Sequence, residues 1–265
     1  MPELVEVERY RVLAAQVAGW RVAAVEAPDP LVAPDGARLG AALTGRTAVG
    51  ARRRGKLLLL DTSGQTLGIR FGMTGTLLLD GRSAVDGLLH APAPRDDRWV
   101  RFRMRLVRGG RARVLALSDP RRLVRVVLDP DEAALGPDAA AVRPAELAAA
   151  LGRGRPGDLA GPALKARLLD QHRLAGVGNL IADEVLWRAG LDPARPASGL
   201  SPAEVRRLHR HLRATIVDLS RWGGSHTGEL MAERRPGGRC PRDGSALRRG
   251  TVAGRTTWWC PAHQR

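Results

Sequence analysis

The first residues of the chain, Met1-Pro2-Glu3, can supply a nucleophile. Initiator methionine is usually removed before a small residue, which would leave Pro2 with a free secondary amine. An α-amino group titrates at about pH 8, so part of it is unprotonated at neutral pH and can attack an electrophilic carbon to form a Schiff base. Glu3 stands beside this amine as a candidate proton donor. The simpler alternative is that proline is common at this position and the acids solvate a first helix.

Only two of the 43 basic residues are lysines, Lys56 and Lys165. Arginine stays protonated and cannot act as a nucleophilic amine. Either these two positions need a lysine, or two lysines survived by chance in an arginine-rich composition. If the chain forms an imine, the candidate amines are Pro2, Lys56 and Lys165.

Each of the two cysteines is followed at the third position by another metal ligand, which gives the set Cys240, Asp243, Cys260 and His263. Two thiolates, a carboxylate and an imidazole complete a tetrahedral Zn²⁺ site, with the pairs on a β-hairpin that turns near Gly254. The alternatives are a disulfide, which is rare in a cytosolic protein, and a metal-free hairpin held by tryptophans. We expect one structural zinc ion.

A Gly-x-Gly turn, Gly176-Val177-Gly178, joins two helical patterns and is followed by Asn179. Without side chains at the glycines, backbone N–H groups at the start of the second helix can approach a phosphate, and the helix dipole favours its negative charge. Asn179 adds a side-chain donor. The alternative is a tight interhelical turn that binds no ligand.

The net charge of +16 and a pI near 11.5 indicate a polyanionic partner. Nucleic acid is favoured over anionic lipid, because no basic amphipathic helix with a bulky apolar face is present. No stretch is apolar enough for a membrane span, and the N-terminus carries acids where a signal peptide carries bases. We expect a monomeric cytoplasmic protein associated with the nucleoid.

The apolar pattern predicts an α+β, multidomain chain. Residues 3–18 have a helical spacing, and short apolar runs punctuated by turns follow up to Leu128. These runs predict an N-terminal antiparallel β-sandwich with flanking helices over residues 1–130. Residues 131–224 are predicted to form a helical domain. Its last helix begins with a capping box at Ser201 and ends at Gly223. Residues 225–265 form the predicted zinc-ribbon β-hairpin.

Several motifs occur together in one order: Pro-Glu-Leu-x-Glu-Val-Glu, Arg-Gly-Lys-Leu-Leu-Leu, Phe-Gly-Met-Thr-Gly, Asp-Pro-Arg-Arg, Ala-Gly-x-Gly-Asn and the terminal hairpin. In this respect the chain resembles the formamidopyrimidine-DNA glycosylase and endonuclease VIII family of base-excision repair. The resemblance runs over nearly the full length. It implies that the helical domain is a helix–two-turn–helix, and that the partner is double-stranded DNA with damaged or abasic nucleotides.

The resemblance also implies roles for single residues. Pro2 would attack C1′ of the damaged nucleotide and Glu3 would transfer a proton, with Glu6 and Glu184 near the site. The residues implied to contact the DNA backbone are Lys56, Lys165, Asn179 and Arg255, to which the turn argument above adds Gly176 and Gly178. Because methionine and leucine in loops are usually core residues, the sequence alone favours a core position for Met73 and Leu123. The resemblance instead implies that Met73, Arg121 and Leu123 fill the gap left by an everted base.

Departures from the family pattern concern substrate choice more than reaction type. Leu123 replaces a phenylalanine and Ile181 a tyrosine, and the segment between Gly224 and Cys240 is short. We therefore expect a bifunctional DNA glycosylase and AP lyase that cleaves abasic sites readily and 8-oxoguanine poorly. The alternative is a non-catalytic damaged-DNA or architectural binding protein, which has no need of Pro2, Glu3 and Lys56 together.

Overall fold

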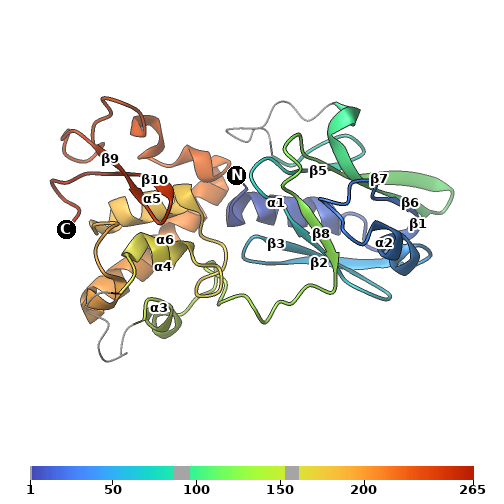
Figure 1. Ribbon diagram of the computed structural model, residues 1–265, viewed down its shortest axis with the longest axis horizontal. Helices are drawn as coiled ribbons and strands as arrows, with labels where there is room; N and C mark the ends of the chain where they lie inside the picture. Colours follow the sequence, from blue (N-terminus) through green and yellow to red (C-terminus); the bar gives the residue numbers. More distant parts are fainter. Residues whose placement is uncertain (1, 86–95, 153–160) are drawn as a thin grey trace. The chain divides into compact units, whose positions relative to one another are not determined.

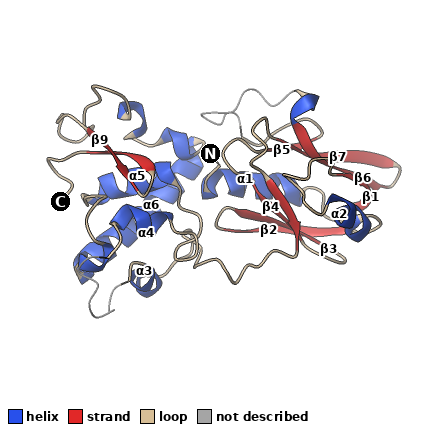
Figure 2. Cartoon of the chain, viewed as in Figure 1, coloured by secondary structure: helices blue, strands red, loops and turns tan. Residues whose placement is uncertain are grey.

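The computed structural model of the chain describes residues 2–85, 96–152 and 161–265, and divides into two compact units, residues 1–132 and 133–265 (Figure 1). Strands dominate the first unit and helices the second, as Figure 2 shows. Within the described residues, no helix combines the length and apolarity needed to cross a bilayer.

The N-terminal unit contains two four-stranded antiparallel sheets. One has the strand order β1-β6-β7-β5, formed by Arg21–Glu26, Val100–Arg108, Arg111–Ser118 and Thr76–Leu79. The other has the order β2-β3-β4-β8, formed by Ala48–Arg54, Leu57–Thr62, Leu67–Arg70 and Arg125–Leu128. Both sheets contribute buried side chains to one core, so the predicted β-sandwich is confirmed.

Two helices flank the sandwich. Helix α1, Leu4–Ala15, adds its Val7, Tyr10 and Leu13 side chains to the same core. The Tyr10 ring packs on Phe71, with ring centroids 4.5 Å apart, which fixes the helix against the residue that precedes the Gly72-Met73 loop. Helix α2, Gly36–Leu43, buries Leu39 and Leu43.

The C-terminal unit is built around two packed helices. Helix α5, Asn179–Ala189, packs on the long helix α6, Pro202–Trp222, while α3, Pro144–Ala150, and α4, Leu164–Leu169, lie against them. The predicted capping box of α6 is confirmed, since the Ser201 hydroxyl accepts from the Glu204 amide at 3.2 Å and the Glu204 carboxylate accepts from the Ser201 amide at 2.7 Å. Its apolar residues Val205, Leu208, Leu212, Ile216 and Leu219 are buried.

The terminal hairpin pairs β9, Arg248–Val252, with β10, Arg255–Trp259, through a turn at Ala253-Gly254. Strand β10 packs against α5. Short 3₁₀ turns at Ser225–Thr227 and Met231–Glu233 join α6 to the hairpin, and further 3₁₀ turns lie at Asp97–Trp99 and Ala197–Gly199. The predicted hairpin at the end of the chain is therefore confirmed.

The connection between β7 and β8 is organised by one buried carboxylate. Asp119 is fully buried and accepts hydrogen bonds from the backbone amides of Arg121, Leu123 and Val124 at 3.0, 2.6 and 2.8 Å. It also accepts one from the Thr74 hydroxyl, which lies in the Gly72-Met73 loop. One side chain thus holds two loops together.

Two further contacts fix the same connection. Gly72 has a φ of +57°, and a Cβ there would lie 2.6 Å from the Leu123 carbonyl oxygen, so only glycine allows this approach. Arg122 adopts a φ of +56° and donates two hydrogen bonds to Asp29, at 2.7 and 2.8 Å. The pKa of Asp29 is held below its usual range by these bonds from Arg122.

We expect Asp119→Asn to destabilise this loop pair by about 2–4 kcal/mol, because hydrogen bonds to a charged acceptor contribute roughly 1.5–3 kcal/mol each and the amide group would face backbone donors. Faster hydrogen exchange at the Leu123 and Val124 amides is the measurement. Asp97→Asn is the control, since its side chain is 94% exposed. Unchanged exchange in Asp119→Asn would contradict the role given to this carboxylate.

Candidate functional site

The start of α1 places two buried carboxylates next to Pro2. Pro2 is itself buried, and Glu3 and Glu6 are each only 1% exposed. Glu3 is the N-cap residue, and its backbone N–H donates to the Glu6 carboxylate at 2.7 Å. An acid in the first turn is also favoured by the helix dipole. Glu3, the predicted proton donor, and Glu6, predicted to lie near the site, therefore share one preorganised turn.

The turn that carries Lys56 is tied to the same helix. Gly55 and Lys56 form the two-residue connection between β2 and β3, with Gly55 at a φ of +56°, as the first position of a type II′ turn requires. Arg53 donates to the Gly55 carbonyl at 2.9 Å and to Glu8 of α1 at 3.2 Å. Lys56 and the start of α1 are therefore held on one scaffold.

The Glu8 carboxylate links helix α1 to strand β2. Arg11 contacts it at 2.8 Å from α1 and Arg53 at 3.2 Å from β2. Partial burial opposes ionisation, but the hydrogen bonds from Arg11 and Arg53 prevail and hold the pKa of Glu8 below its usual value. Sequence reasoning did not single out Glu8, because its partners come from elements distant in the chain.

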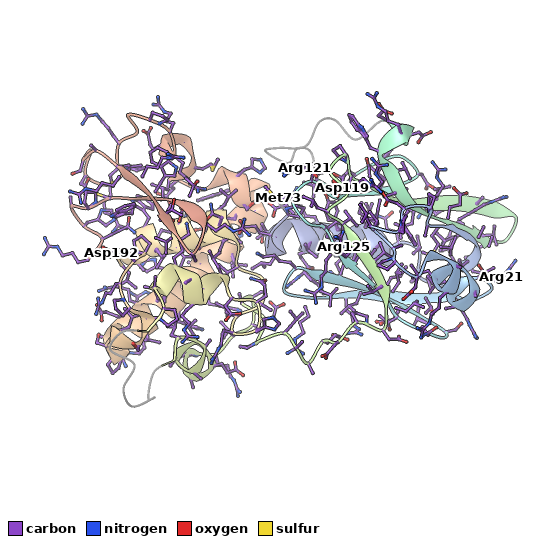
Figure 3. All side chains as sticks on the ribbon, viewed as in Figure 1. Arg21, Met73, Asp119, Arg121, Arg125 and Asp192 are labelled. Carbon is purple, nitrogen blue, oxygen red and sulfur yellow. The ribbon has the colours of Figure 1, made fainter. Side chains whose placement is uncertain are left out.

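Met73, Arg121 and Leu123 lie together, as the resemblance implied. The Arg121 guanidinium lies 3.5 Å from the Met73 sulfur, and Figure 3 shows both side chains beside Asp119. Leu123 is 37% exposed, and Arg121 is exposed as well. The interpretation of Leu123 as a core residue is therefore wrong. Two loops present an apolar pair and one cation at the surface of the N-terminal unit.

The Gly-x-Gly turn is held by a residue that sequence reasoning did not identify as a contributor. The Gln171 side chain donates to the carbonyls of Leu169 and Val177 at 2.8 and 3.0 Å and accepts from the Gly176 amide at 3.0 Å. Gly176 has a φ of +114°, which disfavours other residues. Gly178 is the N-cap of α5. The turn is thus preorganised with the start of α5 following it directly.

Asn179 and Lys165 both reach strand β10. Asn179 donates to the Thr256 carbonyl at 3.1 Å, and the Lys165 ammonium lies 3.2 Å from the same oxygen and 2.8 Å from the Thr257 hydroxyl. Lys165 is fully buried and pairs with Asp183 at 2.6 Å. In this structure the Lys165 ammonium faces protein groups, whereas Arg255, at the β9–β10 turn, is exposed.

Asp183 joins three segments of the C-terminal unit. Besides Lys165 of α4, it contacts Arg234 at 2.8 Å and lies 3.4 Å from the Trp258 amide of β10. Asp183 is 1% exposed and the Arg234 side chain 8%. A buried carboxylate between two cations is tolerated because each charge has an opposite partner. We call Lys165, Asp183 and Arg234 the buried triad.

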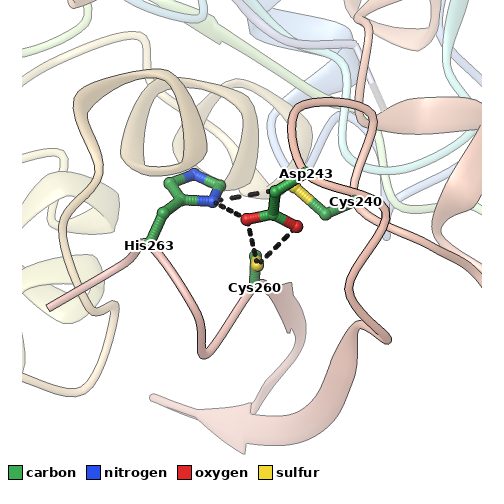
Figure 4. Close-up of side chains that lie close together, drawn as sticks. All are labelled: Cys240, Asp243, Cys260 and His263. Carbon is green, nitrogen blue, oxygen red and sulfur yellow. Dashed lines mark hydrogen bonds and ion pairs between the residues drawn. The ribbon is translucent and has the colours of Figure 1, made fainter.

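The four predicted metal ligands lie together at the base of the hairpin (Figure 4). Their donor atoms all lie within 4.8 Å of one another. Three separations are 3.6 Å from Cys240 Sγ to His263 Nδ1, 3.4 Å from Cys260 Sγ to Asp243, and 3.2 Å from His263 Nδ1 to Asp243. A tetrahedron with zinc bonds of about 2.0–2.3 Å has edges of about 3.3–3.8 Å.

The surroundings of the cluster orient its donors. Both cysteines are unoxidised, so the disulfide alternative is wrong in this structure, and burial raises the pKa of Cys260. His263 Nε2 lies 3.1 Å from the Trp187 carbonyl, which places the proton on Nε2 and leaves Nδ1 to face the cluster. The Trp187 indole N–H donates to Cys240 Sγ at 3.2 Å. This set can hold one divalent metal ion.

Comparisons with known proteins agree over both units. Residues 1–126 match the model of the formamidopyrimidine-DNA glycosylase N-terminal domain, and residues 157–228 match that of the formamidopyrimidine-DNA glycosylase H2TH domain. The chain is 34% identical to a formamidopyrimidine-DNA glycosylase of Methylococcus capsulatus, with 100% of each chain covered. It is 36% identical to that of Moorella thermoacetica, with 94% of each covered.

Solved structures give the same result. The Lactococcus lactis Fpg in complex with DNA containing an abasic site matches with a TM-score of 0.80 and 25% identity, covering 99% of both chains. The same enzyme with DNA containing N7-benzyl-Fapy-dG matches with a TM-score of 0.81 and 26% identity over 100% of both. Sequence, fold and site geometry together place this chain in the formamidopyrimidine-DNA glycosylase family.

Proposed function

We propose that the amine of Pro2 is the nucleophile with which this chain removes damaged bases from double-stranded DNA and then cleaves the strand. Membership of the family makes the chain a DNA glycosylase of base-excision repair, and AP lyase activity is typical of that family. The assignment to Pro2 is supported by the buried Glu3 and Glu6 in the same turn.

In the proposed reaction the Pro2 nitrogen bonds to C1′ as the bond from C1′ to the base breaks, and the base leaves with the proton that the Pro2 nitrogen gives up. The sugar ring then opens to an iminium ion, its ring oxygen taking a proton for which Glu3 is the donor. Loss of a C2′ proton expels the 3′ phosphate, and a second elimination expels the 5′ phosphate. Glu6 holds the Glu3 backbone in position.

Blocking the N-terminus tests this assignment. Protein with extra residues retained before Pro2 has no secondary amine there, so we expect loss of borohydride trapping on an abasic-site duplex and at least a ~100-fold fall in strand cleavage. Pro2→Gly is the informative control, because glycine still offers an amine and should keep some trapping. Full cleavage by the blocked protein would refute the assignment.

The segment after α6 supports a proposal about substrate. Glu184 accepts from the backbone amides of Glu229 and Leu230 at 3.1 and 3.0 Å. A Cβ at Gly228 would lie 2.6 Å from the same carboxylate, so the backbone is pressed against it. Residues 225–234 are thus held against α5 by these contacts. Few residues of the segment between Gly224 and Cys240 are then left to form a loop over an everted base.

We therefore expect low activity on 8-oxoguanine opposite cytosine and high activity on an abasic site. Without a closing loop, selectivity rests on how easily a base leaves the stack, which favours ring-opened, ring-saturated or bulky bases. Single-turnover rates on matched duplexes measure this, and a difference of at least about tenfold is expected. Comparable rates on the two duplexes would show that the short segment does not limit 8-oxoguanine excision.

For the metal cluster we propose one structural zinc ion, since the donor separations fit a tetrahedral site. We expect about one zinc per chain by elemental analysis, and affinity that falls as the pH drops, because metal ligands bind in their deprotonated forms. Asp243→Cys should bind zinc more tightly, because a thiolate is a stronger partner than a carboxylate. Absence of zinc from protein purified without chelators would contradict the proposal.

Lys165 is proposed to position the hairpin through Asp183 rather than to contact a phosphate. Removing one member of a buried ion pair costs about 3–5 kcal/mol. We expect Lys165→Met and Asp183→Asn each to destabilise the C-terminal unit, and the double variant to lose at least about 1 kcal/mol less than their sum. Arg255→Gln is the control: it should weaken DNA binding and lower the salt slope by about one without loss of stability.

The salt dependence separates the two roles of Lys165. A direct phosphate contact predicts that Lys165→Met lowers the salt slope while Asp183→Asn leaves DNA affinity intact. A positioning role predicts parallel loss of affinity in both single variants. The first pattern would overturn the positioning role.

A further inference from the structure

A cavity of about 650 Å³ lies in the C-terminal unit, between the end of α5, helix α6 and the last residues of the chain. Its wall contains five guanidinium groups and a single acidic side chain among the described residues: Arg188, Arg195, Arg207, Arg242, Arg265 and Glu204. None of these residues has a place in the proposed reaction. The cavity therefore needs an explanation of its own.

Two of the five arginines already have acidic partners. Arg195 binds Glu204 with both terminal nitrogens, at 2.6 and 3.1 Å, and this lowers the pKa of Glu204 to about 2. Arg188 contacts Glu184, Asp218 and Glu229 at 2.6–2.8 Å. Their charges are compensated within the protein.

The other three are not compensated. Within the described part of the chain, Arg207, Arg242 and Arg265 form no ion pair with an acid, and the buried Nε of Arg207 has no hydrogen-bond partner. We call these three residues the arginine pocket. Like charges that share a wall repel one another, and a bound anion relieves that repulsion.

The arginine pocket is also partly preorganised. The Arg242 guanidinium stacks on the Trp187 ring at 5.2 Å and donates to the Arg188 carbonyl at 3.3 Å. Trp187 is only 3% exposed, so this platform is fixed. A guanidinium held in place loses less entropy on binding, and its planar donors match a phosphate.

His211 in the same wall supports the anionic preference. Burial lowers its pKa, and so do the neighbouring cations, among them Arg210, Arg242 and Arg188. The cations that lower the pKa of His211 are the same groups that would attract a bound anion. A cation site would be lined by carboxylates and a site for an apolar ligand by apolar side chains, whereas guanidinium groups predominate in this wall.

The cavity lies too far from Arg255 for one phosphate group to contact both. Arg255 begins β10, whereas the cavity includes His263, beyond the other end of that strand. Five extended residues span about 16 Å, so the two ends of the hairpin cannot share one phosphate group. An anion in the cavity is therefore separate from the one assigned to Arg255.

We propose that the arginine pocket binds phosphate, as a second anion site independent of the lesion site. The phosphate can belong to the backbone of a further nucleic-acid segment or to a free phosphate ion, and the experiment below distinguishes them. A backbone segment bound here would give the protein a hold on DNA that does not depend on damage. This inference does not rest on the assignment of Pro2.

The test uses the full-length, metal-loaded protein saturated with a duplex that carries a stable abasic-site analogue, so that the lesion site is filled. A labelled, undamaged single strand is then titrated by fluorescence anisotropy, and inorganic pyrophosphate by calorimetry. The variant is Arg207→Gln/Arg242→Gln. The control is Arg206→Gln/Arg213→Gln, which removes the same charge from exposed positions of α6. Zinc content and thermal melting check that each protein is intact.

We expect the second strand to bind the wild type and to bind the pocket variant at least about tenfold more weakly, with less than about a twofold effect in the control. Lesion cleavage should not change. Binding of pyrophosphate but not of the strand, with the same loss in the pocket variant, would support a site for free phosphate. No binding of either probe, or equal losses in both double variants, would overturn the proposal.

Discussion

Buried carboxylates hold the functional loops of this protein in place. Asp119 gathers three backbone amides and a hydroxyl in the N-terminal unit, and Asp183 joins α4, the segment before the hairpin and β10 in the C-terminal unit. The chain has 27 acidic residues against 43 basic ones, and several of the acids are buried. Their burial is tolerable because backbone donors and arginines surround them. Burial of these acids adds to the excess of cations among the exposed residues, which suits a DNA partner.

Much of the architecture could be predicted from the sequence, because its signals are local. The helical spacing of residues 3–18 and the capping box at Ser201 are each set by residues close in the sequence, and both the helix and the capping box are present. The metal cluster was predictable for a related reason, since its ligands occur as two closely spaced pairs. Strand β2 was not, because only Ala48 of it is buried, and it becomes a strand by pairing with β3.

The site was predictable in its residue types but not in its contacts. Lys165 stood out as a rare lysine, yet a lysine needed for a buried ion pair looks the same in sequence as one needed for a phosphate. The roles of Asp119 and Gln171 in holding the loops were not predictable, since most of their partners are backbone groups brought close by the fold. Leu123 read as core because leucine usually is, and only the fold shows it exposed.

Helix α5 contains two consecutive buried acids, Asp183 and Glu184, and neighbouring residues on a helix point about 100° apart. Asp183 faces the hairpin, whereas Glu184 faces the segment that follows α6. The same short helix begins at Asn179, directly after the Gly-x-Gly turn. Helix α5 is therefore held on two sides, by the hairpin and by the segment that follows α6. A change at the hairpin and a change in residues 225–234 would therefore both act on α5, whose first residue directly follows the Gly-x-Gly turn.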